Sequence, residues 1–309
     1  MIVVFGSINL DLVAEVDRFP LPGETVAGNS FTALPGGKGA NQALAARRAG
    51  ASVAMAGAVG TDAFAATALS ALLEAGVDLG WVRQVDAPTG VALIHVDVQG
   101  QNSIAVIPGA NARVLASVIP DAALRPGTTL VLQLEVPLAA VCDVAARARR
   151  LGARVVLNAA PARDLPDALM SALDVLIVNE HEAATLATAS GMSPEPESFA
   201  TAMHRRHGCA VIVTLGARGA LAAAEAKVFF AAAPAVEVVD TTGAGDAFTG
   251  ALAAALDRDA AWPRALAESV AAGSLACRGP GAQAALPAAA AIDRLAATVQ
   301  SSLVSHPVE

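Results

Sequence analysis

The sequence lacks tyrosine altogether, and only 3% of its 309 residues are aromatic. Proteins that stack nucleic-acid bases rely on aromatic side chains. Positive charge is also in short supply, because 20 lysines and arginines stand against 28 acidic residues, a formal net charge of −8. Since binding to a phosphate backbone depends on clustered positive charge, we expect no nucleic-acid partner.

Cysteine is scarce as well: Cys142, Cys209 and Cys277 lie far apart and form no CxxC pair. An odd, sparse set of thiols argues against a disulfide framework and favours a reducing, cytoplasmic location. No uninterrupted apolar run reaches membrane-spanning length, so we expect no membrane partner. The first residues, MIVVFGSINLD, carry no cationic lead, and we expect a buried strand there and not a signal peptide.

What the chain does contain is a regular alternation of short apolar runs with longer helical patterns. The expected strands are Ile2–Phe5, Val53–Ala56, Leu130–Leu134, Arg154–Leu157, Val175–Val178 and Val211–Val213, and the clearest helices are Asn41–Ala49, Phe64–Glu74 and Leu138–Leu151. Several of these helices are followed by a glycine typical of a C-terminal cap. The pattern is typical of βαβ units and predicts an α/β fold with a doubly wound, mostly parallel sheet flanked by helices.

Two segments, residues 12–34 and 89–107, interrupt this alternation with strands and turns but no helix. In the second segment the apolar residues partly alternate, and VQGQN suits a hairpin turn. We interpret both segments as a small β-sheet lid; the alternative is that they add strands to the edge of the main sheet. With no linker or internal repeat, we treat residues 1–309 as a single α/β domain. Residues after about 287 are alanine-rich and predict little.

Polar residues stand where the predicted strands stop. Glu135, Asn158 and Asn179 end three of these runs, and the motifs NEHE and TLG add Glu182 and Thr214. In open α/β sheets the ligand crevice lies beyond the carboxyl ends of the strands. One polar strand end is ordinary turn chemistry, but a series of four predicts a functional edge suited to hydroxyls, phosphates or a metal.

The stretch DTTGAGDAF, residues 240–248, places two glycines directly before a helical pattern. Gly243 and Gly245 allow backbone conformations in which successive amides converge, and free amides at a helix start form an anion site. Asp246 would repel a phosphate, but it is well placed to accept a proton from a hydroxyl that attacks one. The alternative, which this segment alone leaves open, is that Asp246 only caps the helix.

A second glycine-rich helix start is GGKGAN, residues 36–41. It is not a Walker A loop, and the chain shows no G-x-G-x-x-G between strand and helix, so a dinucleotide-binding interpretation lacks its fingerprint. The amides of this turn, with Lys38 and Asn41, would suit a polyhydroxylated ligand or a phosphate. Asn9 and Asp11, two residues apart, point to the same side of an extended chain and can bracket sugar hydroxyls.

Taken together, GSINLD, LPGGKGANQA, LQLE, NEHE, TLGARG and VDTTGAGDAFTGAL resemble the ribokinase branch of the PfkB carbohydrate kinases. The motifs occur in the family's order and cover roughly residues 1–287. The resemblance implies transfer of the γ-phosphoryl group of ATP to the 5-hydroxyl of D-ribose, with Mg²⁺ as cofactor and K⁺ as activator. It also implies a homodimer formed through the lid, which would cover the lid's exposed strand edges.

The resemblance assigns roles motif by motif. It implies that the sugar is held by Asn9, Asp11, Gly37, Lys38, Gly39, Ala40, Asn41, Glu135 and Asp246, and that Asp246 is also the catalytic base. The amides of Gly243, Ala244 and Gly245 would form the anion hole for the transferring phosphoryl group. The nucleotide would face Gly245, Asn179 and the loop made of Thr214, Leu215, Gly216, Ala217, Arg218 and Gly219.

Two cation sites follow from the resemblance as well. Glu182 would orient Mg²⁺ through water, and K⁺ would be bound by Asp240 and by the carbonyls of Thr242, Ala276, Gly279 and Gly281. Near the second site the family often reads T-R-x-G-A-Q-x-S, whereas this chain reads CRGPGAQAA, with Ala285 in place of a serine. Backbone carbonyls can still serve as ligands there.

Two alternatives remain open. The first is the same reaction on deoxyribose, another pentose, a hexose or a nucleoside, although Asn9, Asp11 and Glu135 favour a small polyol. The second is a sugar sensor that binds without catalysis. Such a sensor would be expected to have lost the base or the glycine-rich anion hole, and both are present in this chain.

Overall fold

The main sheet confirms the predicted architecture. The computed structural model describes residues 1–304, and within them a ten-stranded sheet runs in the order β14-β13-β12-β11-β10-β9-β8-β1-β4-β5. Its parallel part consists of β5 (Asp78–Gln84), β4 (Val53–Val59), β1 (Ile2–Phe5), β8 (Thr129–Leu132), β9 (Arg154–Asn158), β10 (Val175–Asn179) and β11 (Ala210–Thr214). At one edge, β12 (Ala220–Ala224), β13 (Lys227–Ala231) and β14 (Ser301–Val304) continue the sheet with antiparallel pairing.

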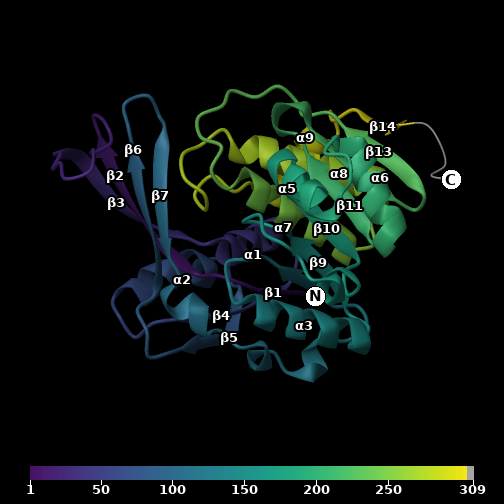
Figure 1. Cartoon of the computed structure of the whole chain (residues 1–309), viewed down its shortest axis with the longest axis horizontal. Helices are drawn as coiled ribbons and strands as arrows, with labels where there is room; N and C mark the ends of the chain where they lie inside the picture. Colours follow the sequence, from purple (N-terminus) through teal and green to yellow (C-terminus); the bar gives the residue numbers. More distant parts are fainter. Residues whose placement is uncertain (305–309) are drawn as a thin grey trace.

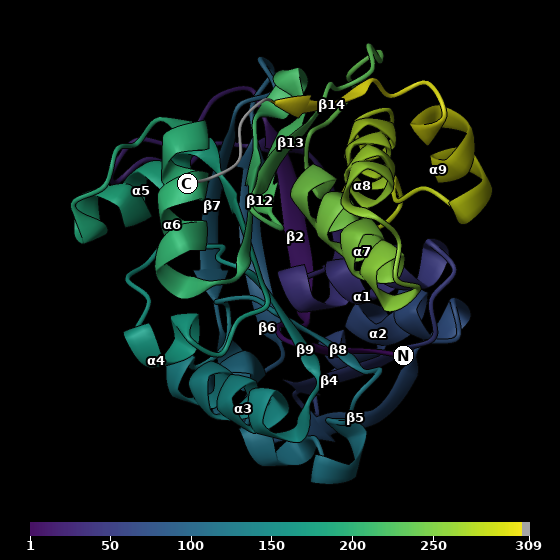
Figure 2. The same cartoon turned by 90° about the vertical axis from the view of Figure 1, so that its right-hand side faces the viewer.

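Helices cover both faces of this sheet (Figure 2). One face carries α1 (Lys38–Arg48), α2 (Phe64–Glu74), α7 (Ala244–Asp257), α8 (Trp262–Ala276) and α9 (Ala289–Ala296), and the other carries α3 (Leu138–Leu151), α4 (Asp167–Met170), α5 (Glu180–Ser190) and α6 (Pro196–His207). Successive side chains of a strand point to opposite faces. In β1, Ile2 and Val4 therefore pack in the first core, and Val3 and Phe5 pack in the second.

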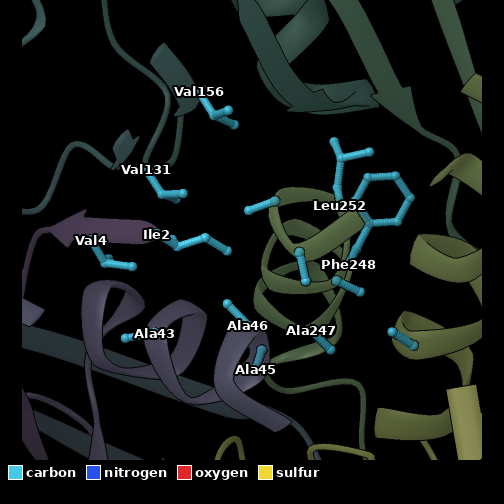
Figure 3. Packing of buried hydrophobic residues seen from close by; sticks show 14 of the residues in the cluster. Ile2, Val4, Ala43, Ala45, Ala46, Val131, Val156, Ala247, Phe248 and Leu252 are labelled. Carbon is cyan, nitrogen blue, oxygen red and sulfur yellow. The ribbon is translucent and has the colours of Figure 1, made fainter. Parts of the chain in front are cut away.

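Helices α1 and α7 pack against each other and against the sheet through small side chains (Figure 3). A Cβ atom added to Gly250 would lie 2.5 Å from the Cβ of Ala45, so this crossing requires a residue without a side chain at position 250. Close approach of the two helices brings their N-terminal turns together. Those turns contain GGKGAN and GAGD, the two glycine-rich motifs of the sequence.

A second, smaller sheet projects from the main body (Figure 1). It has the strand order β3 (Gly28–Gly36), β2 (Asn9–Val16), β6 (Gly90–Val96) and β7 (Asn102–Ile107). The fold-class prediction of a separate small sheet is therefore confirmed, and the alternative that these strands extend the main sheet is wrong. Several of its large apolar side chains are exposed, namely Phe31, Leu93, Ile104, Val106 and Ile107.

Several element boundaries differ from the sequence prediction. Helix α1 begins at Lys38 and not at Asn41, with Gly37 as its N-cap residue, and β8 ends at Leu132. The chain after residue 287, for which little was predicted, forms α9 and then β14, which pairs with β13. Among the helices of residues 1–304, none is long and apolar enough to cross a membrane.

Candidate active site

A cavity of about 230 Å³ opens where β9, β10 and β11 end. Its lining includes Asn158, Asn179, Glu182 and Thr214, so polar strand ends that were predicted to form one edge do meet there. The opposite wall comes from the start of α7 and from α1, with Thr241, Gly243, Gly245, Asp246 and Lys38. This is the crevice expected beyond the carboxyl ends of parallel strands.

Asp246 does not cap its helix. It is the third residue of α7, whose N-cap residue is Gly243, and no side chain caps this helix start. The carboxylate is buried and turned toward α1, where Oδ2 accepts a hydrogen bond from Asn41 Nδ2 (2.9 Å) and Oδ1 accepts one from Gln42 Nε2 (2.8 Å). Of the two interpretations that the sequence left open, the helix cap does not match this geometry. Asp246 is an acid held in the wall of the cavity.

The backbone before Asp246 leaves amide donors open. Gly243 has φ of +77°, and a Cβ atom there would lie 2.9 Å from Cα of Ala282, so only glycine fits this turn. Within residues 1–304, the N–H groups of Gly243 and Gly245 have no backbone partner, whereas that of Ala244 donates to the Thr241 carbonyl (3.2 Å). Two of the three expected anion-hole donors are therefore free, and Ala244 would have to exchange its partner.

The amides of residues 38–41 in GGKGAN are not free, contrary to what the sequence suggested. Because α1 begins earlier than predicted, its first amides lie inside the fold and are already bonded. Lys38 N donates to Glu135 Oε2 (3.0 Å), Gly39 N to Ser7 Oγ (3.2 Å), Ala40 N to the Ser7 carbonyl (2.9 Å), and Asn41 N to the Gly37 carbonyl (2.8 Å). Within residues 1–304 the Gly37 amide has no hydrogen-bond partner, so this amide and the side chains of Lys38 and Asn41 remain to contact a ligand.

The predicted acids gather around Lys38. Burial, together with charge repulsion by Glu135 and Asp246, raises the pKa of Asp11 from 3.8 to about 6. The negative charge of Asp246 raises the pKa of Lys38 against the opposing effect of burial, with further contributions from Glu135 and Glu182. The site therefore combines a cluster of carboxylates with one buried ammonium group that stays charged.

Asp11 and Asn9 lie at the start of β2, next to the GGKGAN turn, and are not among the residues that line the cavity. The Asp11 carboxylate lies over Gly36, where an added Cβ atom would come within 2.2 Å of Oδ2. Asn9 is buried, and its Oδ1 accepts a hydrogen bond from Asn111 Nδ2 (2.7 Å). Asn111 also donates to the Ile8 carbonyl and accepts from the Ile8 amide, so a fixed side chain holds the Asn9 oxygen.

On the other side of the cavity, Asn179 and Glu182 form a reciprocal capping box at the start of α5. Asn179 Oδ1 accepts from the Glu182 amide, and Glu182 Oε2 accepts from the Asn179 amide, both at 2.8 Å. Burial raises the pKa of Glu182 despite the hydrogen bond from Asn179. The NEHE motif thus builds a helix start, and one carboxylate oxygen of Glu182 remains without a protein donor within residues 1–304.

The remaining predicted residues flank this side. Thr214 ends β11, the turn Gly216–Arg218 follows it, and Arg218 pairs with Glu180. Asp240 is half-buried. Its Oδ1 accepts from the Thr242 amide (2.9 Å) and hydroxyl (2.7 Å), and its Oδ2 accepts from the Gly281 amide (2.9 Å). This places the segment that contains Ala276, Gly279 and Gly281 beside Asp240, as the predicted cation site requires.

Sequence reasoning missed several residues of this site: Ser7, Gln42, Asn111, Gln133 and Gln283. Gln42 directly follows Asn41 in the quoted motif GGKGANQA, and that adjacency was the only available signal for it. Ser7, Gln133 and Gln283 likewise lie inside GSINLD, LQLE and CRGPGAQAA, whereas Asn111 lies in none of the motifs.

Comparison with known proteins identifies the family. Residues 1–289 match the profile described as pfkB family carbohydrate kinase. The chain belongs to this family. It is 36% identical to the ribokinase of Haemophilus influenzae over 291 residues, which cover 93% of this chain and 95% of that protein. It is 35% identical to the ribokinase of Bacillus subtilis over 95% of this chain and 98% of the relative.

Solved structures agree with this assignment. The crystal structure of ribokinase from Thermotoga maritima superposes with a TM-score of 0.88 at 32% identity, covering 96% of this chain and 98% of that one. The structure of Arabidopsis thaliana ribokinase complexed with ribose and ATP gives a TM-score of 0.86 at 32% identity with the same coverage. This pfkB-family protein is therefore an ATP-dependent carbohydrate kinase.

Proposed function

We propose that this kinase transfers the γ-phosphoryl group of ATP to the 5-hydroxyl of D-ribose and releases D-ribose 5-phosphate and ADP. The observation that carries the proposal is the position of the Asp246 carboxylate. It lies in the wall of a small polar cavity, one turn from open amides and among the acids and amides of β2 and α1. The relatives named ribokinase, one of them solved with ribose and ATP, support ribose as the acceptor.

The sugar would be held by side chains more than by amides. Asn9, Asp11 and Glu135 offer acceptors for hydroxyl groups, while Lys38 and the second N–H of Asn41 offer donors. Gly37, Gly39 and Ala40 would shape this surface through their lack of bulk, because the amides of Gly39 and Ala40 are bonded to Ser7. Within residues 1–304 only burial and charge act on the Asp11 carboxyl, and no hydrogen bond does, which suits a group that waits for a ligand hydroxyl.

In the reaction, Asp246 would accept the proton of the attacking hydroxyl as the new P–O bond forms and the bond to ADP breaks. The transferring group carries its charge on three oxygens. The amides of Gly243 and Gly245 would stabilise that charge without reorganising, and the amide of Ala244 would join them after exchanging its partner. Lys38 lies close enough to Asp246 and Glu182 to have its pKa raised by both, and its ammonium would add positive charge at the same place.

The nucleotide would occupy the side of the cavity formed by Asn179 and the segment Thr214–Gly219, with its phosphates directed toward Gly245. A Cβ atom at Gly245 would meet nothing within 4 Å, so this face of the α7 turn is open. Asn179 and Thr214 both line the cavity at the ends of adjacent strands.

Two cations fit the residues present. Mg²⁺ bound to ATP keeps several waters and needs few protein ligands, in keeping with Glu182, which lines the cavity and has one carboxylate oxygen without a protein donor within residues 1–304. When bound, it would neutralise phosphate charge. K⁺ would lie between Asp240 and the carbonyls of Thr242, Ala276, Gly279 and Gly281. Equal rates in potassium and in an organic cation would exclude that site.

The small sheet would act as a lid that closes over the sugar and limits wasteful hydrolysis of ATP. Its exposed apolar residues, including Phe31, Ile104 and Val106, favour pairing with a second copy, and a purely monomeric protein in analytical ultracentrifugation would exclude this. We expect the enzyme in the cytoplasm, in keeping with its three free cysteines.

The deciding experiment is Asp246→Asn. We expect this variant to bind ribose with unchanged affinity, measured by calorimetry, and to lose at least about 1,000-fold in kcat, because the base is gone while the size of the side chain remains. Turnover within a few-fold of the parent would show that Asp246 is not the base. A coupled ADP-release assay on ribose, deoxyribose, hexoses and nucleosides would test the acceptor, and ADP release with any of them would exclude the sensor.

A further inference from the structure

The carboxylate of Asp246 lies at the centre of a buried amide network. Each of its oxygens accepts a hydrogen bond from an α1 side chain, Oδ2 from Asn41 and Oδ1 from Gln42, and both amides are almost fully buried. The second N–H of Gln42 Nε2 donates to Asn158 Oδ1 (3.0 Å), at the end of β9. Two inner amides therefore hold the carboxylate from the side of α1.

Two further amides contact the inner pair. Gln133 Nε2, just beyond β8, donates to Gln42 Oε1 (2.7 Å), and Gln283 Nε2, in the loop between α8 and α9, donates to Asn41 Oδ1 (3.0 Å). Both outer side chains are buried. The loop that carries Gln283 is tied to α1 a second time, because Arg48 Nη1 donates to the carbonyls of Gln283 and Leu286, each at 2.8 Å.

The direction of every hydrogen bond follows from the acid at the centre. A carboxylate accepts only, so Asn41 and Gln42 must turn their NH₂ groups toward it. Their oxygens then face outward and require a donor, which Gln133 and Gln283 supply with their own NH₂ groups. Reversing either inner amide would set oxygen against the Asp246 oxygen and NH₂ against NH₂.

The fixed direction of these hydrogen bonds leaves, among the described residues, an unpaired oxygen at each outer end of the network. Gln133 Oε1 and Gln283 Oε1 are buried and have no hydrogen-bond partner within residues 1–304. Gly6 makes room for the first of them, since an added Cβ atom there would come within 1.9 Å of Gln133 Oε1. Buried acceptors without partners are destabilising and rare in native proteins. A chain that retains two of them at the ends of one network points to a use for the network.

We propose that Gln133 and Gln283 are positioning residues which, through Gln42 and Asn41, fix the orientation of the Asp246 carboxylate for proton transfer. Each carboxylate oxygen has a lone pair beyond the one that its amide occupies. Held on both oxygens, the carboxylate cannot rotate, and a free lone pair stays directed at the cavity where the sugar hydroxyl would lie. The proposal rests on the proposed role of Asp246 as the base.

The test uses isosteric variants that lack the amide: Gln42→Met, Gln133→Met and Gln283→Met. We expect kcat to fall at least about tenfold for Gln42→Met and about threefold or more for Gln133→Met, with KM for ribose and ATP within twofold of the parent. A loss in kcat without a change in KM marks an interaction realised only in the transition state. For Gln283→Met, KM for ribose should rise as well, because Asn41 would also contact the sugar.

Thr249→Val is the matched control. Thr249 lies in the same helix as Asp246, is fully buried, and has a hydroxyl without a partner within residues 1–304, so its kcat should stay within twofold of the parent. Thermal unfolding of each variant confirms that it is folded at the assay temperature. An equal loss of kcat in Thr249→Val would mean that general packing explains the effect and would overturn the proposal.

Asp246→Asn distinguishes a failure of the positioning proposal from a failure of the proposed role of Asp246 as the base. If Asp246→Asn abolishes turnover while the three glutamine variants keep kcat within twofold, the network does not position the base, and only this proposal fails. If Asp246→Asn keeps its turnover, Asp246 is not the base, and the proposal that the network positions it fails as well.

Discussion

The two sides of the cavity differ in how far their partners lie apart in the sequence. On the sugar side, the contacts Asn9–Asn111, Lys38–Glu135 and Asn41–Asp246 join residues 102, 97 and 205 positions apart. On the nucleotide side, Asn179 bonds Glu182 three positions away, and Asp240 bonds Thr242 two positions away. The sugar side therefore exists only in the folded chain, whereas much of the nucleotide side consists of local turns and helix caps.

Because the two sides are held together differently, substitutions on them should have different effects. A side chain held by distant partners cannot relax without breaking the packing of α1, α7 and β2, so the sugar side is preorganised. A local cap can be lost while the rest of the structure persists. Substitutions on the sugar side should therefore change acceptor recognition, and those on the nucleotide side should mainly change local stability.

Among the substitutions that test this comparison of the two sides, Glu135→Gln should have the largest effect. Glu135 Oε2 accepts from both Ser7 Oγ (2.5 Å) and Lys38 N (3.0 Å), and an amide offers only one acceptor oxygen and no charge. We expect kcat/KM for ribose to fall about 100-fold, mostly through KM, since hydrogen bonds to a charged group are the strong ones. Steady-state kinetics with each substrate varied in turn will measure this.

The KM for ATP is the internal control for Glu135→Gln and should stay within twofold of the parent. If the KM for ATP rose as much as that for ribose, the two sides of the cavity would not be separable, and the comparison between them would be broken.

The second effect concerns the free energy of unfolding. Because the folded state raises the pKa of Asp11 from 3.8 to about 6, it binds this proton more tightly than the unfolded chain does. The resulting stabilisation is present below about pH 4 and is lost as pH rises through about 6. At pH 8 the Asp11 carboxylate is therefore a net cost, on the order of 2 kcal/mol after allowance for partial exposure.

Asp11→Asn should remove that cost while weakening ribose binding. Urea unfolding is expected to find the variant more stable than the parent at pH 8, with the difference shrinking toward zero at pH 4. If the variant were less stable than the parent at pH 8, the charged Asp11 carboxylate would not be destabilising, and this prediction would be wrong. Gains in stability at the expense of function are common at such sites.

Most of the fold could be predicted from the sequence because its signals are local. The βαβ alternation gave six of the seven strands of the parallel part, all but β5, together with α1, α2 and α3, and VQGQN marked the turn between β6 and β7. The edge strands β12 and β13 were missed, since ALAAA in β12 is alanine-rich, and alanine favours helices. There, pairing with β11 and β13 overrides the local preference.

The residues of the site also differ in whether the sequence could predict them. The resemblance of motifs gave Asn9, Asp246 and the glycine turns, but Asn111 and Gln283 became visible only in the structure, because their roles depend on contacts across the fold. The sequence also holds a pattern that was interpreted too narrowly. NEHE has the spacing of a capping box, so its acid at Glu182 has a structural use beside any role toward a metal.

The smallest effect tests that double use of Glu182 on the nucleotide side. Glutamine can replace glutamate in a capping box, so Glu182→Gln should leave the free energy of unfolding within about 0.5 kcal/mol of the parent. If Glu182 also orients Mg²⁺, the Mg²⁺ concentration for half-maximal rate should rise a few-fold in this variant. Glu195→Gln is the matched control, because Glu195 caps α6 through the amides of Glu197 and Ser198 and does not line the cavity. Equal Mg²⁺ requirements in both variants would leave Glu182 as a helix cap alone, and the nucleotide side would then be purely local structure.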